Sequence, residues 1–413
     1  MRNYAIVTAA YWGFTLTDGA LRMLVLLHFF LLGFSPFTLA FLFVLYEAAG
    51  IVANLVGGWL AVRFGITRML AVGLGLQVIA FLFLSRLDPG WGLALSVGWA
   101  VAAQGLAGVA KDLTKTASKS AIKLTAEAAS GGQASGGLLF RWVAWFTGSK
   151  NAMKGLGFFL GGVLLEAFGF RLALVAMAGA LAVVLVSVLV SLPPLFGRAA
   201  PSRTIRAFFA KNRGVNLLAA ARIALFAARD VWFVVGLPVF LYAHGWSFAG
   251  VGLFLALWTI GYGGVQAAAP ALVRRSEDGL AREVPATRAW GAALAAVPAL
   301  LAAALAAGLP VSPDIVVAVG LSLFGVFFAM NSSLHSYLIL AYAGSEKAAE
   351  DVGFYYAANA TGRLMGTLAS GALYQWGGLG ACLAGSAVLA AIAAAASLAL
   401  PSTSEARAAP AAS

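Results

Sequence analysis

The sequence from Tyr4 to Leu32, YAIVTAAYWGFTLTDGALRMLVLLHFFLL, is apolar over most of its length and contains one acid, Asp18, and one arginine, Arg22. At a rise of about 1.5 Å per residue, a helix of this length crosses a hydrocarbon core of about 30 Å. No small-residue cleavage site follows it, so it fits a removable signal peptide badly. We therefore expect the first membrane-spanning helix here.

The remainder of the chain repeats this apolar pattern. Of its 413 residues, 62% are hydrophobic and 10% are charged, and the mean hydropathy is +0.92. A water-soluble domain of this composition would expose large apolar patches. We predict an all-α membrane protein with twelve transmembrane helices, near residues 4–32, 37–62, 66–86, 91–112, 141–168, 171–192, 215–243, 247–272, 286–308, 314–342, 351–377 and 379–400.

The basic residues, 27 lysines and arginines against 15 acids, lie mostly in the even-numbered connections between these spans. The positive-inside rule therefore puts both termini and the linker at 193–214 in the cytoplasm, with the chain in the inner (plasma) membrane. No polar stretch is long enough to form a nucleic-acid-binding domain, so we expect no nucleic-acid partner. The small, polar tail at 401–413 is expected to be disordered.

Matching residues recur at fixed offsets along the chain. Such recurrence indicates an internal repeat, and we predict an N-terminal six-helix bundle at 1–192 and a C-terminal six-helix bundle at 215–400. An offset of 212 relates Asp18 to Asp230, Gly33 to Gly245, Ser35 to Ser247 and Tyr46 to Trp258, and an offset of 209 relates Lys154 to Arg363, Gly157 to Gly366, Gly162 to Gly371 and Gly169 to Gly378.

The connection after the second span, GGWLAVRFGITR at 57–68, resembles the loop motif of the major facilitator superfamily. Val62 stands where that motif has an aspartate, which weakens the usual charge-relay account of gating. The resemblance implies two parallel six-helix halves, a cargo site at midplane where the halves meet, and transport by alternating access.

Several predicted spans carry charges, which are costly in a membrane unless they pair or line a wet cavity. Asp18 and Arg22 are four residues apart, a spacing that allows an ion pair within one helix. The basic residues outnumber the acids, so we predict that an anionic cargo binds the basic set, with purely structural ion pairs as the alternative. The basic candidates are Arg22, Lys150, Lys154, Arg229 and Arg363, and the acids that oppose them are Asp18, Glu47 and Asp230.

Proton coupling needs a group that exchanges a proton during transport. The candidates for coupling or gating are Asp18, Glu47, Asp230 and the mid-span imidazole of His335, and both uniport and proton antiport fit this set. We expect no cofactor and no metal, and the single cysteine, Cys382, excludes a site of several thiolates. We expect no enzyme either, because no nucleophile with a base and no cofactor motif is present.

Four strings resemble the ArsJ family, the organoarsenical efflux permeases of the major facilitator superfamily. They are residues 11–22, 110–123, 148–154 and 228–233. This resemblance implies export of 1-arseno-3-phosphoglycerate, an arsenate ester made by a companion glyceraldehyde-3-phosphate dehydrogenase, and hence arsenate resistance. We expect a monomer in the lipid bilayer. The alternatives are a transporter of phosphate or a phosphorylated metabolite, and a membrane receptor or scaffold.

Overall fold

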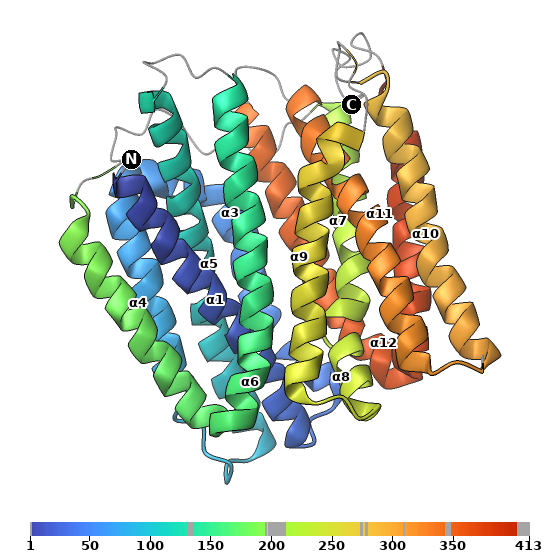
Figure 1. Cartoon of the computed structure of the whole chain (residues 1–413), viewed down its shortest axis with the longest axis horizontal. Coiled ribbons are helices and arrows are strands. Elements are labelled where there is room, and N and C mark those ends of the chain that lie inside the picture. The colour runs from blue at the N-terminus through green and yellow to red at the C-terminus, as the bar shows by residue number, and fades with distance from the viewer. Residues whose placement is uncertain are drawn as a thin grey trace. The chain divides into compact units, whose positions relative to one another are not determined.

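The computed structural model of the chain describes residues 2–129, 136–194, 196, 212–272, 276, 280–308, 310–342 and 348–402, and its regular elements there are helices (Figure 1). Most of the predicted linker at 193–214 and of the predicted tail at 401–413 lies outside these residues. The helices are α1 (Arg2–Leu31), α2 (Pro36–Phe41), α3 (Val44–Phe64), α4 (Ile66–Leu84), α5 (Leu93–Ala129), α6 (Gly136–Ser191), α7 (Arg213–Phe233), α8 (Gly236–Ala243), α9 (Phe248–Leu272), α10 (Glu283–Ala307), α11 (Pro313–Tyr342) and α12 (Ala348–Leu398).

Within the described residues, 10 segments are long and apolar enough to cross a membrane. Two of them, Ser149–Ser191 and Gly353–Leu398, have 43 and 46 residues, which is about twice the length that one span needs. The backbone leaves the helical conformation at Gly169 in the first and at Gly377 and Gly378 in the second. Both kinks fall where the sequence predicts the turn between two spans, and the total of twelve spans stays a prediction.

The left-handed backbone at these kinks explains why glycine stands there. Gly169 has φ 68° and Gly378 has φ 62°, and a residue with a Cβ rarely adopts such values. The predicted partners Gly33 and Gly245 also have positive φ, 80° and 87°. Residues that the sequence aligns at offsets of 209 and 212 therefore share an unusual backbone conformation.

Two predicted spans are each divided into two helices. The span predicted at 37–62 forms α2 and α3, and the span predicted at 215–243 forms α7 and α8. Pro238 accounts for the second break, because its ring clashes with the carbonyl four residues earlier in a continuous helix. The buried amides of Val235 and Gly236, which the break removes from the helical hydrogen-bond pattern, donate to Ser370 Oγ at 3.2 and 3.1 Å, so no orphan donor remains at these positions.

The chain divides into two compact units. Unit 1 comprises Met1–Leu32, Leu42–Arg203 and Ser247–Ile260, and in it α1 packs on α6 while α3 and α4 pack on α5. Unit 2 comprises Gly33–Phe41, Thr204–Trp246 and Gly261–Ser413, and in it α7 and α10 pack on α12. Cys382 is buried within unit 2, with its Sγ 3.5 Å from the Ser370 carbonyl oxygen.

Glycines let helix backbones touch within each unit. A Cβ on Gly161 of α6 would lie 2.5 Å from the carbonyl oxygen of Ala20 on α1. A Cβ on Gly366 of α12 would lie 2.8 Å from the carbonyl oxygen of Ala227 on α7. Small residues at such contacts are the usual means of close helix packing in membranes. They hold α1 against α6 and α7 against α12 beside the charged residues of each unit.

Each unit also repeats one capping contact. In unit 1, Glu166 Oε2 accepts the amide of Ala249 at 3.3 Å, and in unit 2, Gln375 Oε1 accepts the amide of Phe37 at 3.3 Å. Glu166 and Gln375 are 209 residues apart, and Phe37 and Ala249 are 212 apart, the same two offsets that the sequence analysis uses. An internal repeat produces such parallel contacts, although the repeat itself stays a prediction.

Candidate functional site

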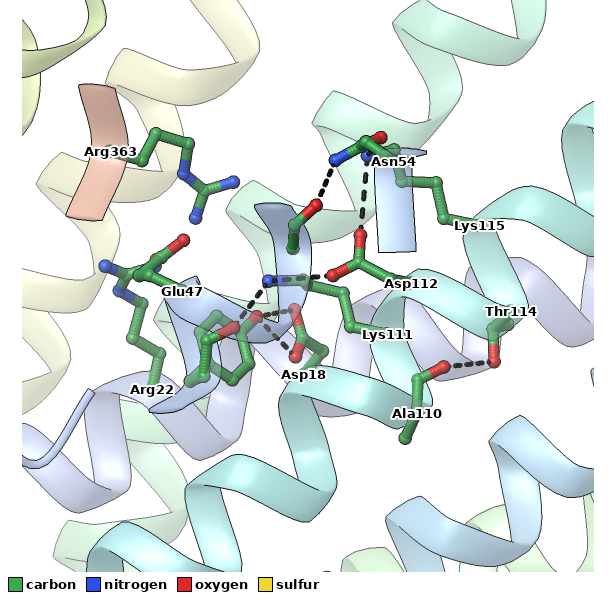
Figure 2. Close-up of polar contacts among 12 residues, drawn as sticks. Asp18, Arg22, Glu47, Asn54, Ala110, Lys111, Asp112, Thr114, Lys115 and Arg363 are labelled. Atoms are coloured by element: carbon green, nitrogen blue, oxygen red, sulfur yellow. Dashed lines mark hydrogen bonds and ion pairs between the residues drawn. The ribbon is translucent and has the colours of Figure 1, made fainter. Parts of the chain in front are cut away.

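Arg22 on α1 forms a buried ion pair with Glu47 on α3. Its Nη1 lies 3.1 Å from Glu47 Oε1, and the two residues are 8% and 1% exposed (Figure 2). Its guanidinium carbon also lies 5.2 Å from the centroid of the Phe43 ring. The ion pair between Asp18 and Arg22 that their spacing allows is not formed, because Arg22 finds its acid on a neighbouring helix. Two of the predicted site residues, Arg22 and Glu47, thus neutralise each other.

Asp18, one turn before Arg22, has a neutral partner. The hydroxyl of Tyr46 lies 2.7 Å from Oδ1 and 2.8 Å from Oδ2 of this buried carboxylate (Figure 2). Within the described part of the chain, no basic side chain forms an ion pair with Asp18. The hydrogen bond to the Asp18 carboxylate thus comes from a group without a formal charge.

Tyr46 also contacts α5, where two lysines flank a buried acid. Lys111 Nζ lies 3.3 Å from the Tyr46 carbonyl oxygen and 3.7 Å from its ring centroid, and it pairs with Asp112 Oδ2 at 3.7 Å. Lys115 Nζ lies 3.5 Å from Asp112 Oδ1 and 3.0 Å from Asn54 Oδ1 (Figure 2). The sequence analysis did not select Asp112 as a site residue, although it stands between Lys111 and Lys115 in the string 110–123.

Lys150 and Lys154 lie on α6 of unit 1, the helix that packs against α1. Both residues are half-buried, and Lys154 Nζ lies 5.7 Å from the centroid of the Phe158 ring. A Cβ on Gly19 would lie 2.7 Å from the Lys154 carbonyl oxygen, so the α6 backbone runs directly beside α1 at Asp18. Lys154 and Asp18 therefore lie on two helices that are in direct contact.

In unit 2, two arginines contact one buried acid, Asp230 on α7. Arg229 Nε donates to Asp230 Oδ1 at 2.6 Å, and Arg363 Nε of α12 lies 3.6 Å from Asp230 Oδ2. Asp230 is 1% exposed. Of the predicted basic residues, Arg229 and Arg363 are therefore brought together by the structure, and they hold the same carboxylate.

Arg222, one more arginine of α7, was not among the predicted site residues. It is 4% exposed, and its Nη1 donates to both Oγ and the carbonyl oxygen of Ser332, at 3.1 Å each. No carboxylate of the described residues pairs with it. Arg222 stands with Arg229 and Asp230 in the span predicted at 215–243, but nearer its end, and was therefore not counted among the deepest charges. The useful signal was its place as a second arginine in a span with a single acid.

His335, a predicted coupling candidate, lies on α11 one turn after Ser332. It is 1% exposed, and neither of its ring nitrogens has a hydrogen-bond partner within the described residues. Ser332, one turn before it, accepts both hydrogen bonds from Arg222. The structure therefore groups His335 with Arg222 rather than with Asp230.

Comparison with known proteins adds a family and a fold. The sequence profile of the Major Facilitator Superfamily matches residues 4–350. Among curated proteins, no match is found.

Three solved transporter structures resemble this chain over nearly their whole length. A D-xylose-proton symporter has 14% sequence identity and a TM-score of 0.70, with 97% of each chain covered. A nucleoside transporter has 13% identity and a TM-score of 0.71, covering 97% of this chain and 99% of its own. A proton-dependent oligopeptide transporter has 13% identity and a TM-score of 0.67, covering 96% and 97%. At these identities the likeness establishes the fold alone.

Proposed function

The chain belongs to the major facilitator superfamily, and from that premise we propose that it exports the anionic organoarsenical 1-arseno-3-phosphoglycerate from the cytoplasm by alternating access. Membership makes the chain a multi-pass secondary transporter of the lipid bilayer, and the prediction that it is not an enzyme is confirmed. The cargo, the companion dehydrogenase and the resulting arsenate resistance belong to the proposal.

The observation that carries the choice of cargo is the convergence of the strings that resemble the organoarsenical permeases. Asp18 and Arg22 come from the first string, and Lys111, Asp112 and Lys115 come from the second. Although they lie on α1 and α5, Asp18 and Lys111 both contact Tyr46. Charged residues that carry a family likeness and gather in one buried cluster are candidates for function rather than for lipid contact.

The charge of the buried residues agrees with an anion. Arg22 and Arg229 lie inside predicted spans and each pair with one acid, whereas the buried Arg222 pairs with no carboxylate of the described residues. A guanidinium offers a planar fork of donors that matches phosphate-like oxygens, and arsenate has the same tetrahedral arrangement of oxygens. A cargo with a phosphate end and an arsenate end fits this chemistry better than a sugar or a lipophilic cation.

The two kinked segments and the parallel caps support the proposed architecture. If Gly169 and Gly378 each separate two spans, the ten long segments supply twelve spans in two six-helix repeats. We further propose a monomer in the plasma membrane with both termini in the cytoplasm.

The proposal allows two transport modes, uniport and proton antiport. Export of an anion from a negative-inside cell is favoured by about 2.3 kcal/mol per charge per 100 mV, which is enough for uniport. In proton antiport, Asp18 is the candidate proton carrier, because Tyr46 gives it a hydrogen bond without a compensating charge.

The deciding experiment measures arsenate accumulation in cells that carry the chain with and without the companion dehydrogenase. We expect low accumulation only when both are present, because the dehydrogenase makes the ester that the chain exports. Inside-out vesicles that form the ester in situ provide the second measurement. Uptake of phosphate or 3-phosphoglycerate without uptake of the ester would instead identify a transporter of ordinary phosphorylated anions.

A further inference from the structure

Unit 2 contains a buried polar group around Arg222 in which some hydrogen-bond donors have no acceptor among the described residues. Arg222 Nη1 is satisfied by Ser332, but Arg222 Nε has no hydrogen-bond partner within the described residues. Neither ring nitrogen of His335, one turn along α11, has one. A buried donor without an acceptor destabilises the folded state, and it does so more strongly when the group is charged. The group therefore has unused capacity for an acceptor.

The charge on Arg222 is also poorly compensated. The described part of the chain gives it two aromatic faces, with ring centroids of Phe226 and Tyr355 at 4.2 and 4.8 Å, but no carboxylate. Cation–π contacts offset only part of the free-energy cost of burying a cation that has no counter-charge. A ligand that brings negative charge would offset the difference.

The neighbouring side chains come from separate helices and offer further polar groups. Gln266 Nε2 on α9 donates to Ser332 Oγ at 3.3 Å, the same oxygen that accepts from Arg222. Ser332 thus ties α7, α9 and α11 together within unit 2. Donors that approach from different helices suit a tetrahedral group, which accepts in several directions, better than a flat carboxylate.

We propose that Arg222, Ser332 and His335, with Gln266, form a binding site for a tetrahedral oxyanion, which takes one terminal phosphate or arsenate group of the exported cargo. The identification of that cargo rests on the proposed function. The site itself requires only an oxyanion, and Asp230 does not belong to it, because that acid is held by Arg229 and Arg363.

Thermal unfolding of the purified chain with inorganic phosphate or 3-phosphoglycerate tests this proposal. We expect both probes to raise the melting temperature of the wild-type chain, because a ligand that binds the folded state stabilises it. Arg222→Met should weaken both effects at least tenfold in apparent affinity. Without ligand, this variant should melt at or above the wild-type temperature, because it removes a buried charge that pairs with no carboxylate of the described residues.

Arg288→Met is the matched control. Arg288 lies in the same unit and donates to the carbonyl oxygens of Ser397, Leu398 and Leu400, so its loss should lower the ligand-free melting temperature and leave the response to the probes intact. Arg222→Lys keeps the charge without the fork and should bind with intermediate affinity. His335→Gln keeps a donor and should lose less than Arg222→Met.

Three results would overturn the site: no stabilisation of the wild-type chain by either probe, wild-type binding by Arg222→Met, or an Arg222→Met variant that behaves like Arg288→Met. If Arg222→Met does not fold, the Lys and Gln variants decide, and wild-type affinity in both overturns the site. The proposed function fails separately. If the probes bind at Arg222 but arsenate tolerance does not need the chain, the site stands and the cargo is wrong.

Discussion

Asp18 in unit 1 and Asp230 in unit 2 hold the same position in the predicted repeat, but their partners differ. Asp18 accepts two contacts from the neutral hydroxyl of Tyr46, whereas Asp230 lies between the guanidinium groups of Arg229 and Arg363. Asp230 is thus held by two cations, whereas the hydrogen-bond donor of Asp18 is uncharged. The comparison favours Asp18 over Asp230 as the proton carrier.

The basic residues near the two acids also differ. Arg363 of α12 pairs with Asp230, whereas Arg22, the arginine one turn from Asp18, pairs with Glu47. We therefore propose that this position of the predicted repeat serves as an anchor in unit 2 and as a proton-exchanging group in unit 1.

The largest expected effect comes from removing the anchor. Asp230→Asn leaves Arg229 buried without its carboxylate, and loss of one partner of a buried ion pair costs about 3–5 kcal/mol. We expect a sharp fall in membrane abundance and in melting temperature. Asp18→Asn, at the same repeat position, is the control and should retain both. Equal stability of the two variants would remove the distinction between anchor and exchangeable group.

Truncation of Lys154 or Arg363, the two basic residues related by the offset of 209, should remove function with less loss of stability than Asp230→Asn. Lys154→Ala and Arg363→Ala are each expected to abolish arsenate tolerance while membrane abundance stays at the wild-type level. Growth in arsenate with the companion dehydrogenase, together with immunoblotting of membranes, provides the measurement. Retained tolerance in both variants would exclude these residues from the cargo path.

The proton role of Asp18 predicts a change in pH dependence rather than in folding. If the chain is an antiporter, Asp18→Asn should make export independent of pH, because the amide has no proton to exchange. Initial rates in vesicles across a pH series give the measurement. Asp230→Glu is a matched variant that should keep the wild-type dependence, and a pH response that survives Asp18→Asn would assign coupling elsewhere.

Removal of the Tyr46 hydroxyl should cost less. Tyr46→Phe leaves the buried Asp18 carboxylate without its donor, at a cost of about 1–3 kcal/mol. In the double variant with Asp18→Asn the charge is gone, so the added cost of Tyr46→Phe should shrink. Melting temperatures of the four proteins form a double-mutant cycle, and strictly additive effects would show that the contact contributes little.

The smallest effect concerns the two capping residues. Glu166 places a negative charge at the start of α9, and Gln375 places a neutral oxygen at the start of α2. Charge at a helix N-terminus is worth about 0.3–1 kcal/mol. Glu166→Gln should therefore lower the melting temperature slightly, and Gln375→Glu should raise it slightly. A shift of the same sign in both variants would show that the two capping contacts are not equivalent.

Much of the helical framework could be predicted from apolar length, because a bilayer imposes it. The prediction for 66–86 differs from α4 by two residues at its end, and the predicted turn after 168 coincides with the kink at Gly169. The division between α7 and α8 had a visible cause in Pro238. The division between α2 and α3, at Leu42 and Phe43, contains no proline or glycine, so it could not be predicted from the sequence.

The charged residues were identified more reliably than their partners. Sequence spacing relates only residues on one helix, so it indicated Asp18 as the partner of Arg22. In the structure Arg22 pairs with Glu47, which is 25 residues away on another helix. Arg222 was overlooked for a related reason. Its importance follows from burial without a carboxylate, which depends on the surrounding helices and cannot be deduced from the order of residues.

The burial of Cys382 has a practical consequence for spectroscopy. The chain has this one thiol, and it is enclosed in unit 2 beside Ser370. Maleimide reagents that modify exposed cysteines should therefore leave the native protein unlabelled. Fluorophores or spin labels can be placed on engineered surface cysteines without first mutating a native residue, and their distance distributions would follow the transport cycle directly.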